Sequence, residues 1–365
     1  MALRCGIVGL PNVGKSTLFN SLSRAKAESA NYPFCTIDPN VGTIPVPDKR
    51  LYKIAELVKP EKVFPTTIEF VDIAGLVKGA SKGEGLGNQF LANIRETDAI
   101  IHILRCFDED NVSHVDGSVD PVRDKEVVDI ELQLKDLETV RNRMQKIDKQ
   151  AKTGDKEAKK LLGILKKYEE YLSQGKPVRD LDLNKKENDM VKDLHLLTDR
   201  PVLYVCNVDE SSAVEGNRYV EQVKKAVVSE DAEVLVIAAS VEAEINELET
   251  EEERQMFLED IGLKESGLNK LIHAAYRLLH LVTFFTAGPK EVRAWTVKIG
   301  TPAPVAGGMI HSDFERGFIK AEVIKYPDFV DKGSESACRE AGKLYLEGKD
   351  YIVKDGDIIT FKFNV

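Results

Sequence analysis

Short runs of hydrophobic residues along the first two thirds of the chain predict a series of buried strands. Five such runs are continuous or alternating in hydrophobicity, and they lie at 3–8, 66–72, 99–104, 201–206 and 233–238. Two further stretches, 17–22 and 267–276, carry apolar residues at helical spacing. Strands and helices mixed along one chain in this way favour an α/β fold.

Between about residues 126 and 171 the pattern changes to that of two long helices. Apolar residues recur mostly at steps of three and four, at Ile130, Leu134, Leu137, Met144, Ile147 and Ala151, and then at Leu161, Leu165, Tyr168 and Leu172. Residues 152–155, Lys-Thr-Gly-Asp, break the chain between the two groups. We therefore expect a helical hairpin that projects as a two-stranded coiled coil.

From Thr283 onward the pattern becomes rich in short strands. Segments of strand character at 292–297, 319–324 and 358–363 are separated by turns and by one helix. A chain of 365 residues exceeds one typical domain. We predict three parts, which are a discontinuous α/β domain (1–125 and 190–280), an inserted α-helical coiled-coil hairpin (126–189) and a β-rich carboxy-terminal domain (281–365).

Charge is unevenly distributed along the chain. The formal net charge of −10 argues against a general nucleic-acid coat. Residues 141–186, however, contain 14 Lys and Arg against 7 Asp and Glu, a balance of +7, whereas residues 242–260 are acidic. The basic hairpin could contact RNA phosphates, and a solvated charged face is the alternative explanation.

The cysteines and the hydropathy indicate the compartment. The five cysteines are scattered, odd in number and never spaced C-x-x-C, which argues against a disulfide framework and a zinc site. We expect most of them to be small core residues, with a redox role for Cys35 as an alternative. No run approaches the roughly 18 apolar residues of a membrane span, and the first residues lack a secretory signal pattern. These features predict a cytoplasmic protein.

Residues 9–16, Gly-Leu-Pro-Asn-Val-Gly-Lys-Ser, match the full G-x-x-x-x-G-K-[ST] phosphate-loop motif. The motif lies between a predicted strand and a predicted helix, which is the placement that its chemistry requires. Backbone N–H groups of the turn and the amino terminus of the helix then converge on a triphosphate. We expect Lys15 to neutralise the β and γ phosphates during catalysis and the Ser16 hydroxyl to bind magnesium.

Two downstream segments are candidates for sensing the γ phosphate. Residues 31–40 are rich in turn formers, and Thr36 is the candidate that completes the magnesium shell, with an ordinary loop threonine as the alternative. A predicted strand then ends in a D-x-x-G element at 72–75. We expect Asp72 to hold magnesium through water and the N–H of Gly75 to contact the γ phosphate.

The group that orients the attacking water is not evident. Leu76 stands where many signalling GTPases place a glutamine, so we expect a low intrinsic rate of hydrolysis. His114, in a predicted exposed loop, is a candidate to approach the γ phosphate, with a surface histidine as the alternative. His102 lies in a predicted buried strand and is expected to be a core histidine. Asn12, inside the phosphate loop, could help to hold a monovalent cation, which makes potassium a hypothesis.

The residues that should select the base follow the predicted strand at 201–206. Guanine-binding switch proteins carry N-K-x-D there, and the aspartate accepts hydrogen bonds from the ring N1–H and the 2-amino group. This chain has Asn207-Val208-Asp209-Glu210 instead. The longer side chain of Glu210 is misplaced for that bidentate contact, and adenine offers neither donor. We therefore expect guanine selectivity to be lost.

With the hairpin and the β-rich tail, these motifs make the chain resemble the YchF family of Obg-like ATPases from end to end. The most specific stretches are 6–17, 70–80 and 349–357. The resemblance implies a switch-type nucleotide domain interrupted by the hairpin and followed by a TGS domain of ubiquitin-like shape. It also implies a preference for ATP over GTP and an association with ribosomes.

The resemblance can be carried over to individual positions of this sequence. It implies that the phosphates are bound by Asn12, Val13, Gly14, Lys15, Ser16 and Thr17. It implies that Ser16 and Thr36 bind magnesium and that Asn207 and Val208 contact adenine. Glu210 belongs to the same base-binding segment, and whether it touches the base is left open.

We therefore expect a slow magnesium-dependent ATPase that alternates between two conformations and binds ribosomal particles or RNA through the hairpin, the TGS domain or the groove between them. Catalysis would rest on positioning and electrostatics supplied by Lys15, magnesium and backbone donors. One alternative is a translation-associated GTPase, against which residues 207–210 argue. Another is a nucleotide-gated binding scaffold with incidental hydrolysis, which Leu76 favours.

Overall fold

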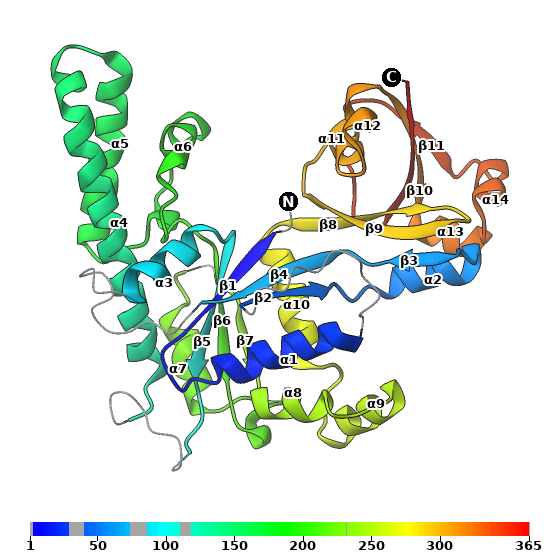
Figure 1. The fold of residues 1–365 in the computed structure, drawn as a ribbon, viewed down its shortest axis with the longest axis horizontal. Coiled ribbons are helices and arrows are strands. Elements are labelled where there is room, and N and C mark those ends of the chain that lie inside the picture. The colour runs from blue at the N-terminus through cyan, green and yellow to red at the C-terminus, as the bar shows by residue number, and fades with distance from the viewer. Residues whose placement is uncertain (1–2, 29–39, 74–85, 110–117, 231, 365) are drawn as a thin grey trace. The chain divides into compact units, whose positions relative to one another are not determined.

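The computed structural model describes residues 3–28, 40–73, 86–109, 118–230 and 232–364 (Figure 1). The chain forms two compact units. The first consists of Met1–Ile44 and Glu69–Ala275, and the second of Pro45–Ile68 and Tyr276–Val365. The segment Pro45–Ile68 thus belongs to the second unit, whereas the sequence pattern assigned it to the amino-terminal domain.

The first unit is built on a six-stranded sheet with the order β2-β4-β1-β5-β6-β7. Its strands are β1 (Arg4–Val8), β2 (Val41–Pro45), β4 (Thr67–Asp72), β5 (Ala99–Arg105), β6 (Val202–Asn207) and β7 (Val234–Ile237). The pairs β4–β1, β1–β5, β5–β6 and β6–β7 are parallel. All residues of β5 and β6 are buried, as expected for central strands covered on both faces. Because parallel strands end at one edge of the sheet, the loops that follow them meet there.

Helices flank this sheet, and a helical hairpin is inserted between β5 and β6 (Figure 1). The helices are α1 (Lys15–Glu28), α3 (Leu86–Arg95), α4 (Pro121–Lys152), α5 (Lys156–Ser173), α6 (Lys185–Val191), α7 (Arg218–Ala226), α8 (Ala239–Ile245), α9 (Glu251–Asp260) and α10 (Gly267–Leu278). Short 3-10 turns lie at η2 (Val178–Asp180), η3 (Lys192–Leu194) and η4 (Glu210–Ser212). The α/β fold predicted from the pattern is confirmed.

The hairpin has a third packing layer that the heptad-like pattern did not predict. Helices α4 and α5 run side by side (Figure 1). The apolar residues of α5 are buried between α4 and the returning chain. The returning residues that join this core are Val178, Leu183, Val191 and Leu196. The predicted helical hairpin of two long helices is confirmed, and the returning chain adds to its core. The core is wider because the turns η2 and η3 and helix α6 fold back against the hairpin.

The buried face of α4 also differs from the prediction in its first half. Ile130 and Leu134 were expected to be apolar contacts, but they are 52% and 46% exposed. The buried residues there are Val128 and Leu132, which lie on a different face of the helix. This half of α4 packs on the sheet and on α7 rather than on α5, so a different face of the helix is covered.

The second unit contains a sheet with the order β11-β10-β12-β8-β9-β3. Its strands are β3 (Lys62–Phe64), β8 (Leu281–Ala287), β9 (Glu291–Lys298), β10 (Phe318–Lys325), β11 (Leu344–Glu347) and β12 (Asp357–Phe363). Its helices are α2 (Lys49–Val58), α11 (Ala303–Gly308), α12 (Ser312–Arg316), α13 (Tyr326–Lys332) and α14 (Glu335–Glu340). The expected β-rich carboxy-terminal region is confirmed, with four short helices after β9 where one was predicted.

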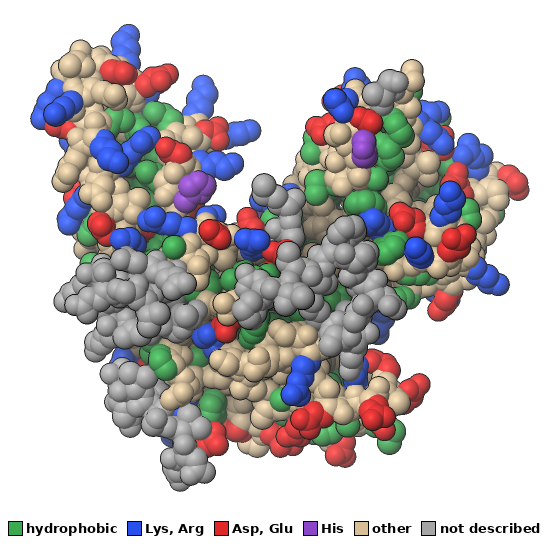
Figure 2. Space-filling view, in the orientation of Figure 1, with side chains coloured by type: hydrophobic (Ala, Val, Ile, Leu, Met, Phe, Trp, Pro, Cys, Tyr) green, Lys and Arg blue, Asp and Glu red, His purple; other side chains and the backbone are tan. Residues whose placement is uncertain are grey.

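The basic and acidic segments of the sequence form separate regions of the described surface. Figure 2 shows Lys and Arg side chains distributed over the hairpin and Asp and Glu side chains gathered near α8 and α9. None of the described helices combines the length and hydrophobicity that a membrane span requires. Four cysteines, Cys5, Cys106, Cys206 and Cys338, are buried free thiols, as expected for core residues. Cys35 lies outside the described residues.

Candidate nucleotide-binding site

The phosphate-loop motif connects β1 to α1, which is the placement predicted from the sequence. Gly14 has a φ of +88° and Asn12 a φ of +62°, so the loop turns sharply before the helix begins at Lys15. The Leu18 N–H donates to the Gly14 carbonyl at 3.0 Å and so starts the intrahelical hydrogen bonds. The first turn of α1 contains no acidic residue, which leaves its amino terminus suited to an anion. Ser16 is exposed at this end of the helix.

Asn207, at the end of β6, holds the phosphate loop in place. Its Nδ2 donates to the Val13 carbonyl at 3.0 Å, and its Oδ1 accepts from the Ala239 N–H at 2.9 Å. The Asn207 side chain is buried, and Gly14 packs directly against it. A Cβ built on Gly14 would lie 2.1 Å from Asn207 Nδ2, so only glycine fits there. The Asn207 side chain therefore links the phosphate loop after β1 to the segment after β7 by two hydrogen bonds.

Lys15 and Asp72 are brought together at the other side of the loop. The Lys15 ammonium forms an ion pair with the carboxylate of Asp72, the last residue of β4. Pairing of Ile7 with Asp72 in the β1–β4 ladder fixes the position of this carboxylate beside the phosphate loop. The described residues contain no group of three His, Cys, Asp or Glu suited to a metal.

A magnesium ion that is completed by phosphate oxygens and water needs few protein ligands. The hydroxyl of Ser16 at the start of α1 and the carboxylate of Asp72 are hard oxygen donors, and both flank Lys15. This donor set fits magnesium better than a softer transition metal. Thr36 and Gly75, the other residues predicted around the phosphates, lie outside the described residues.

The segment expected to contact the base follows Asn207. Val208 is only 2% exposed, and its N–H donates to the Ile237 carbonyl at 2.9 Å. The Asp209 carboxylate caps η4 by accepting from the Ser211 hydroxyl at 2.5 Å and the Ser212 N–H at 3.0 Å. These hydrogen bonds, that of Ser211 first, hold the pKa of Asp209 below its ordinary value. Asp209 is therefore engaged within its own turn, whereas Glu210 is exposed.

The loop after β5 is fastened by residues that the sequence analysis did not single out. Arg105, 2% exposed, donates to the carbonyls of Phe107 and Glu109 at 3.2 and 3.3 Å. Asn217 caps α7 and donates to the Cys106 carbonyl at 2.7 Å. An asparagine before an amphipathic helix signals a cap, but no local pattern reveals a bond to a residue 111 positions away. His114, the candidate near the γ phosphate, lies outside the described residues.

His102 is a core residue, as its strand pattern predicted. It is 2% exposed and packs its ring 5.7 Å from that of Tyr204. Burial, together with the charges of Lys125 and Arg179, lowers the pKa of His102 to about 3. A histidine that is neutral and enclosed in this way has no role in orienting water at the phosphate loop.

Comparison with known proteins places this geometry in a family. A model described as "50S ribosome-binding GTPase" matches residues 4–207, and the YchF-GTPase_C model, described as a protein of unknown function, matches residues 281–364. A protein named ribosome-binding ATPase YchF from Bacillus subtilis (strain 168) is 56% identical over 367 residues, and its namesake from Escherichia coli O157:H7 is 54% identical over 365 residues. Both alignments cover 100% of this chain and 100% of the relative.

A solved structure agrees with these alignments over both units. The YchF GTPase of Schizosaccharomyces pombe matches with a TM-score of 0.90 at 39% identity, covering 99% of this chain and 97% of that chain. The bacterial relatives are thus named as ATPases and the fungal structure as a GTPase. Identity above half along the full length, together with the same fold in a solved structure, shows that the chain belongs to the YchF family of phosphate-loop nucleoside triphosphatases.

Proposed function

We propose that this protein is a magnesium-dependent switch that binds and slowly hydrolyses ATP and that associates with ribosomes. The observation that carries the proposal is the arrangement around Asn207, which holds the phosphate loop while the residues after it depart from the guanine-binding pattern. The names of the bacterial relatives support both ATP and the ribosome as ligands. Association with ribosomes would place the protein in the cytoplasm.

The preference for ATP rests on two features of the base segment. Reading guanine requires a carboxylate that accepts from N1–H and the 2-amino group, and Glu210 is one methylene too long at that position. Asp209 is one residue earlier, and its carboxylate is already used to cap η4. Val208 is buried and offers no charged group where guanine-binding proteins have a lysine. An adenine ring has neither of these donors, so the lack of a suitably placed carboxylate costs it no hydrogen bond.

Hydrolysis would proceed by positioning and electrostatics. Lys15 would exchange Asp72 for phosphate oxygens and neutralise the charge that develops on them. Ser16, Thr36 and, through water, Asp72 would hold magnesium, which supplies further neutralisation of the β and γ phosphates when bound. The N–H of Gly75 would contact the γ phosphate.

Two further residues concern the rate of hydrolysis. Leu76 cannot orient water, so the intrinsic rate should be low, and a partner that orders the following segment should raise it. His114 is the candidate for the missing group. Asn12, which adopts a positive φ in the loop, could help to hold potassium beside the phosphates. Equal rates of hydrolysis in sodium and potassium would contradict that part of the proposal.

The hairpin and the TGS-like unit are the proposed ribosome- and RNA-binding elements. Residues 141–186 carry 14 basic against 7 acidic side chains, which suits an RNA surface. The base of the hairpin also contacts the nucleotide domain, since Arg95 of α3 donates to the Thr139 hydroxyl of α4 at 3.0 Å. Helix α3 follows the D-x-x-G segment at 72–75 in the chain. A nucleotide-dependent movement of α3 would therefore reach the hairpin directly.

The first test is the affinity for ATP and GTP, measured by calorimetry with magnesium and potassium present. We expect a preference for ATP of tenfold or more, which is about 1.4 kcal/mol. The double substitution Val208→Lys with Glu210→Asp restores N-K-x-D and should shift the preference towards GTP. Tighter or equal binding of GTP by the unmodified chain would contradict the base-site argument and favour a translation-associated GTPase.

A second experiment distinguishes between two hypotheses, an ATPase and a nucleotide-gated scaffold with incidental hydrolysis. Leu76 favours the scaffold. Lys15→Ala should abolish nucleotide binding, and with it co-sedimentation with ribosomes in the presence of ATP. A variant that binds ATP but does not hydrolyse it should remain bound to ribosomes and fail to be released. If that variant associates and dissociates like the unmodified chain, hydrolysis is incidental and the scaffold explanation holds.

A further inference from the structure

The chain leaves the sheet of the first unit after one strand and returns to it in the neighbouring strand, with 21 residues in between. Strand β2 ends at Pro45 and β4 begins at Thr67, and these strands are adjacent at the edge of the sheet. The intervening residues 46–66, which we call the excursion, form α2 and β3 and belong to the second unit. The two units are thus connected through the β2–β4 ribbon as well as through α10.

The two ends of this ribbon are marked by backbone hydrogen bonds. At one end the Asp72 N–H donates to the Asn40 carbonyl at 2.8 Å, and at the other the Val46 N–H donates to the Thr66 carbonyl at 2.8 Å. Residue 40 therefore faces 72 and residue 46 faces 66, so the two strands run in opposite directions. The first end carries the carboxylate that pairs with Lys15 of the phosphate loop. The second end opens into the excursion.

The excursion is firmly attached to the second unit. Leu51 and Ile54 of α2 are fully buried in a core with Phe285 and Val292 of that unit. Strand β3 pairs in parallel with β9. At the neck of the excursion, the Thr66 hydroxyl hydrogen-bonds to that of Thr296. These contacts make α2 and β3 move with the sheet of the second unit.

Polar contacts add to this attachment at the start of α2. Arg50 bonds to Asp355 at 2.6 Å and lies 5.5 Å from the centre of the Phe285 ring. Asp48, the residue before the helix, accepts from the Arg50 N–H at 2.9 Å and forms an ion pair with the Arg50 side chain. The charged contacts therefore tie the first turn of α2 to the carboxy-terminal part of the second unit.

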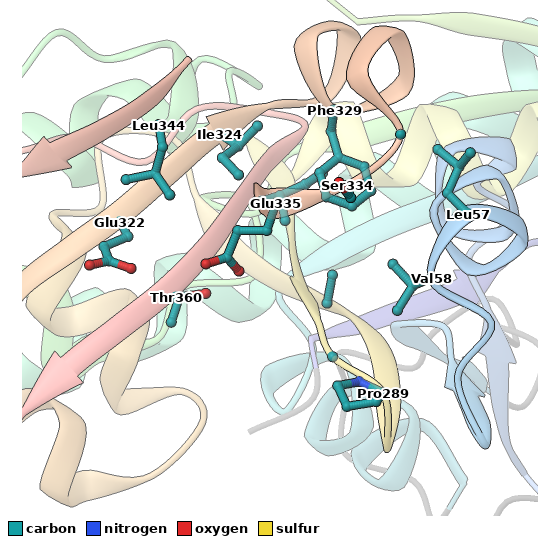
Figure 3. A pocket seen from close by; sticks show the side chains of 14 residues that line it. Leu57, Val58, Pro289, Glu322, Ile324, Phe329, Ser334, Glu335, Leu344 and Thr360 are labelled. Carbon is teal, nitrogen blue, oxygen red and sulfur yellow. The ribbon is translucent and has the colours of Figure 1, made fainter. Parts of the chain in front are cut away.

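The far end of α2 borders a cavity of about 330 Å³ within the second unit. Figure 3 shows Leu57 and Val58 on one side of this cavity and Leu344 and Thr360 on the other. Close-packed interiors resist displacement, whereas an unfilled space beside a helix lets its side chains shift at low cost. Leu57 and Val58, at the end of α2, can thus shift slightly into this space while Leu51 and Ile54 keep their contacts.

We infer that the β2–β4 ribbon is a lever that couples the occupancy of the phosphate loop to the second unit. This inference rests on the proposed function, because Lys15 must exchange Asp72 for phosphate oxygens when a nucleotide binds. A strand rises about 3.3 Å per residue, so the five residues of β2 carry a displacement over roughly 17 Å. Strand pairing makes the ribbon stiff, so movement at Asp72 arrives at the neck of the excursion. The second unit would then sense the nucleotide through the covalent chain.

The experiment is hydrogen exchange of the full chain, comparing the nucleotide-free protein with the protein bound to magnesium and a non-hydrolysable ATP analogue. We expect exchange of amides in α2 and β3 to differ between the two states by about threefold or more. Strand β11, at the opposite edge of the same sheet, is the internal control and should not change. Protection of residues 9–18 by the analogue shows that nucleotide is bound.

A variant with a Gly-Gly insertion after Pro47 and another after Phe64 should uncouple the lever. We expect it to lose the nucleotide-dependent change in α2 and β3 while keeping its affinity for the analogue within about twofold. The same insertions in the turn at 348–349, where Gly348 has open space around it, serve as the matched control.

Protection of 9–18 without any change in α2 and β3 of the unmodified chain would overturn the inference and leave the proposed function intact. An unchanged response of α2 and β3 in the double-insertion variant would overturn it as well. Absence of protection at 9–18 would instead refute the proposed function. If the double-insertion variant does not fold, the comparison on the unmodified chain still decides the question.

Discussion

Replacing Gly14 with alanine should disconnect Asn207 from the phosphate loop. A Cβ at this position would lie 2.1 Å from Asn207 Nδ2, far inside van der Waals contact, so one of the two groups must move. Asn207 is fixed by its bonds to the Val13 carbonyl and the Ala239 N–H. Moving it breaks at least one of these bonds in a buried position. The effect of Gly14→Ala should therefore depend on whether the asparagine is present.

The magnitudes follow from the local geometry. A non-glycine residue at a φ of +88° costs about 1–2 kcal/mol. Leaving a buried hydrogen-bonding group without its partner costs about 1–3 kcal/mol, so Asn207→Ala, which leaves two such groups, should cost about 2–6 kcal/mol. Gly14→Ala, through strain and one lost bond, should cost about 2–5 kcal/mol. In the double variant the clash is gone, so its loss should be about 1–3 kcal/mol smaller than the sum of the single losses.

The assay is a double-mutant cycle on the free energy of unfolding in urea, followed by far-UV circular dichroism. Trp295, the single tryptophan, lies in β9 of the second unit, so its fluorescence serves as an internal control for that unit. Nucleotide affinity, measured by calorimetry on the same variants, should show the same pattern. If the two substitutions are additive to within about 0.5 kcal/mol, Asn207 and Gly14 are not coupled and the account of the loop is wrong.

Three further substitutions test buried polar groups of the first unit. Burial lowers the pKa of His102 to about 3, so only the unfolded state takes up this proton between pH 6.5 and 5. The free energy of unfolding should therefore fall by about 2 kcal/mol over that range. His102→Phe should flatten this part of the pH profile in urea, whereas His311→Phe, at an exposed site, should keep it. Asp136→Asn should lower the unfolding free energy by about 2–4 kcal/mol, because the buried carboxylate accepts three hydrogen bonds from the segment 197–198. Burial raises the pKa of Glu242, so the unmodified chain should gain stability over Glu242→Gln as the pH falls towards the ordinary pKa of a glutamate, and an unchanged difference would contradict this.

Much of the nucleotide site could be predicted because its residues belong to short, continuous sequence motifs. The glycines and the lysine of 9–16 constrain the backbone and the charge locally, and the structure places them between β1 and α1. Asp72 and Asn207 each end a strand with a recognisable pattern, and parallel pairing brings both to the edge where the phosphate loop lies. The roles predicted for individual residues in binding phosphate, magnesium and adenine remain predictions.

Features that depend on distant segments could not be predicted in this way. Leu51 and Ile54 give α2 an apolar face, but nothing local indicates that the face is covered by residues more than 200 positions later. Ile130 and Leu134 fit a coiled-coil pattern and are exposed because the lower half of α4 packs on the sheet instead. In both cases tertiary contacts, rather than periodicity, decide which face is buried.

The bonds of Asn207 also separate phosphate binding from base selection. Its Oδ1 is occupied by the Ala239 N–H, and one Nδ2 hydrogen is occupied by the Val13 carbonyl. The remaining Nδ2 hydrogen can meet only an acceptor, such as N7, which adenine and guanine share. If Asn207 meets the base at N7, this bond gives no preference for ATP over GTP. We therefore predict that substitutions at 208 and 210 change the preferred base while the loop that holds the phosphates stays intact.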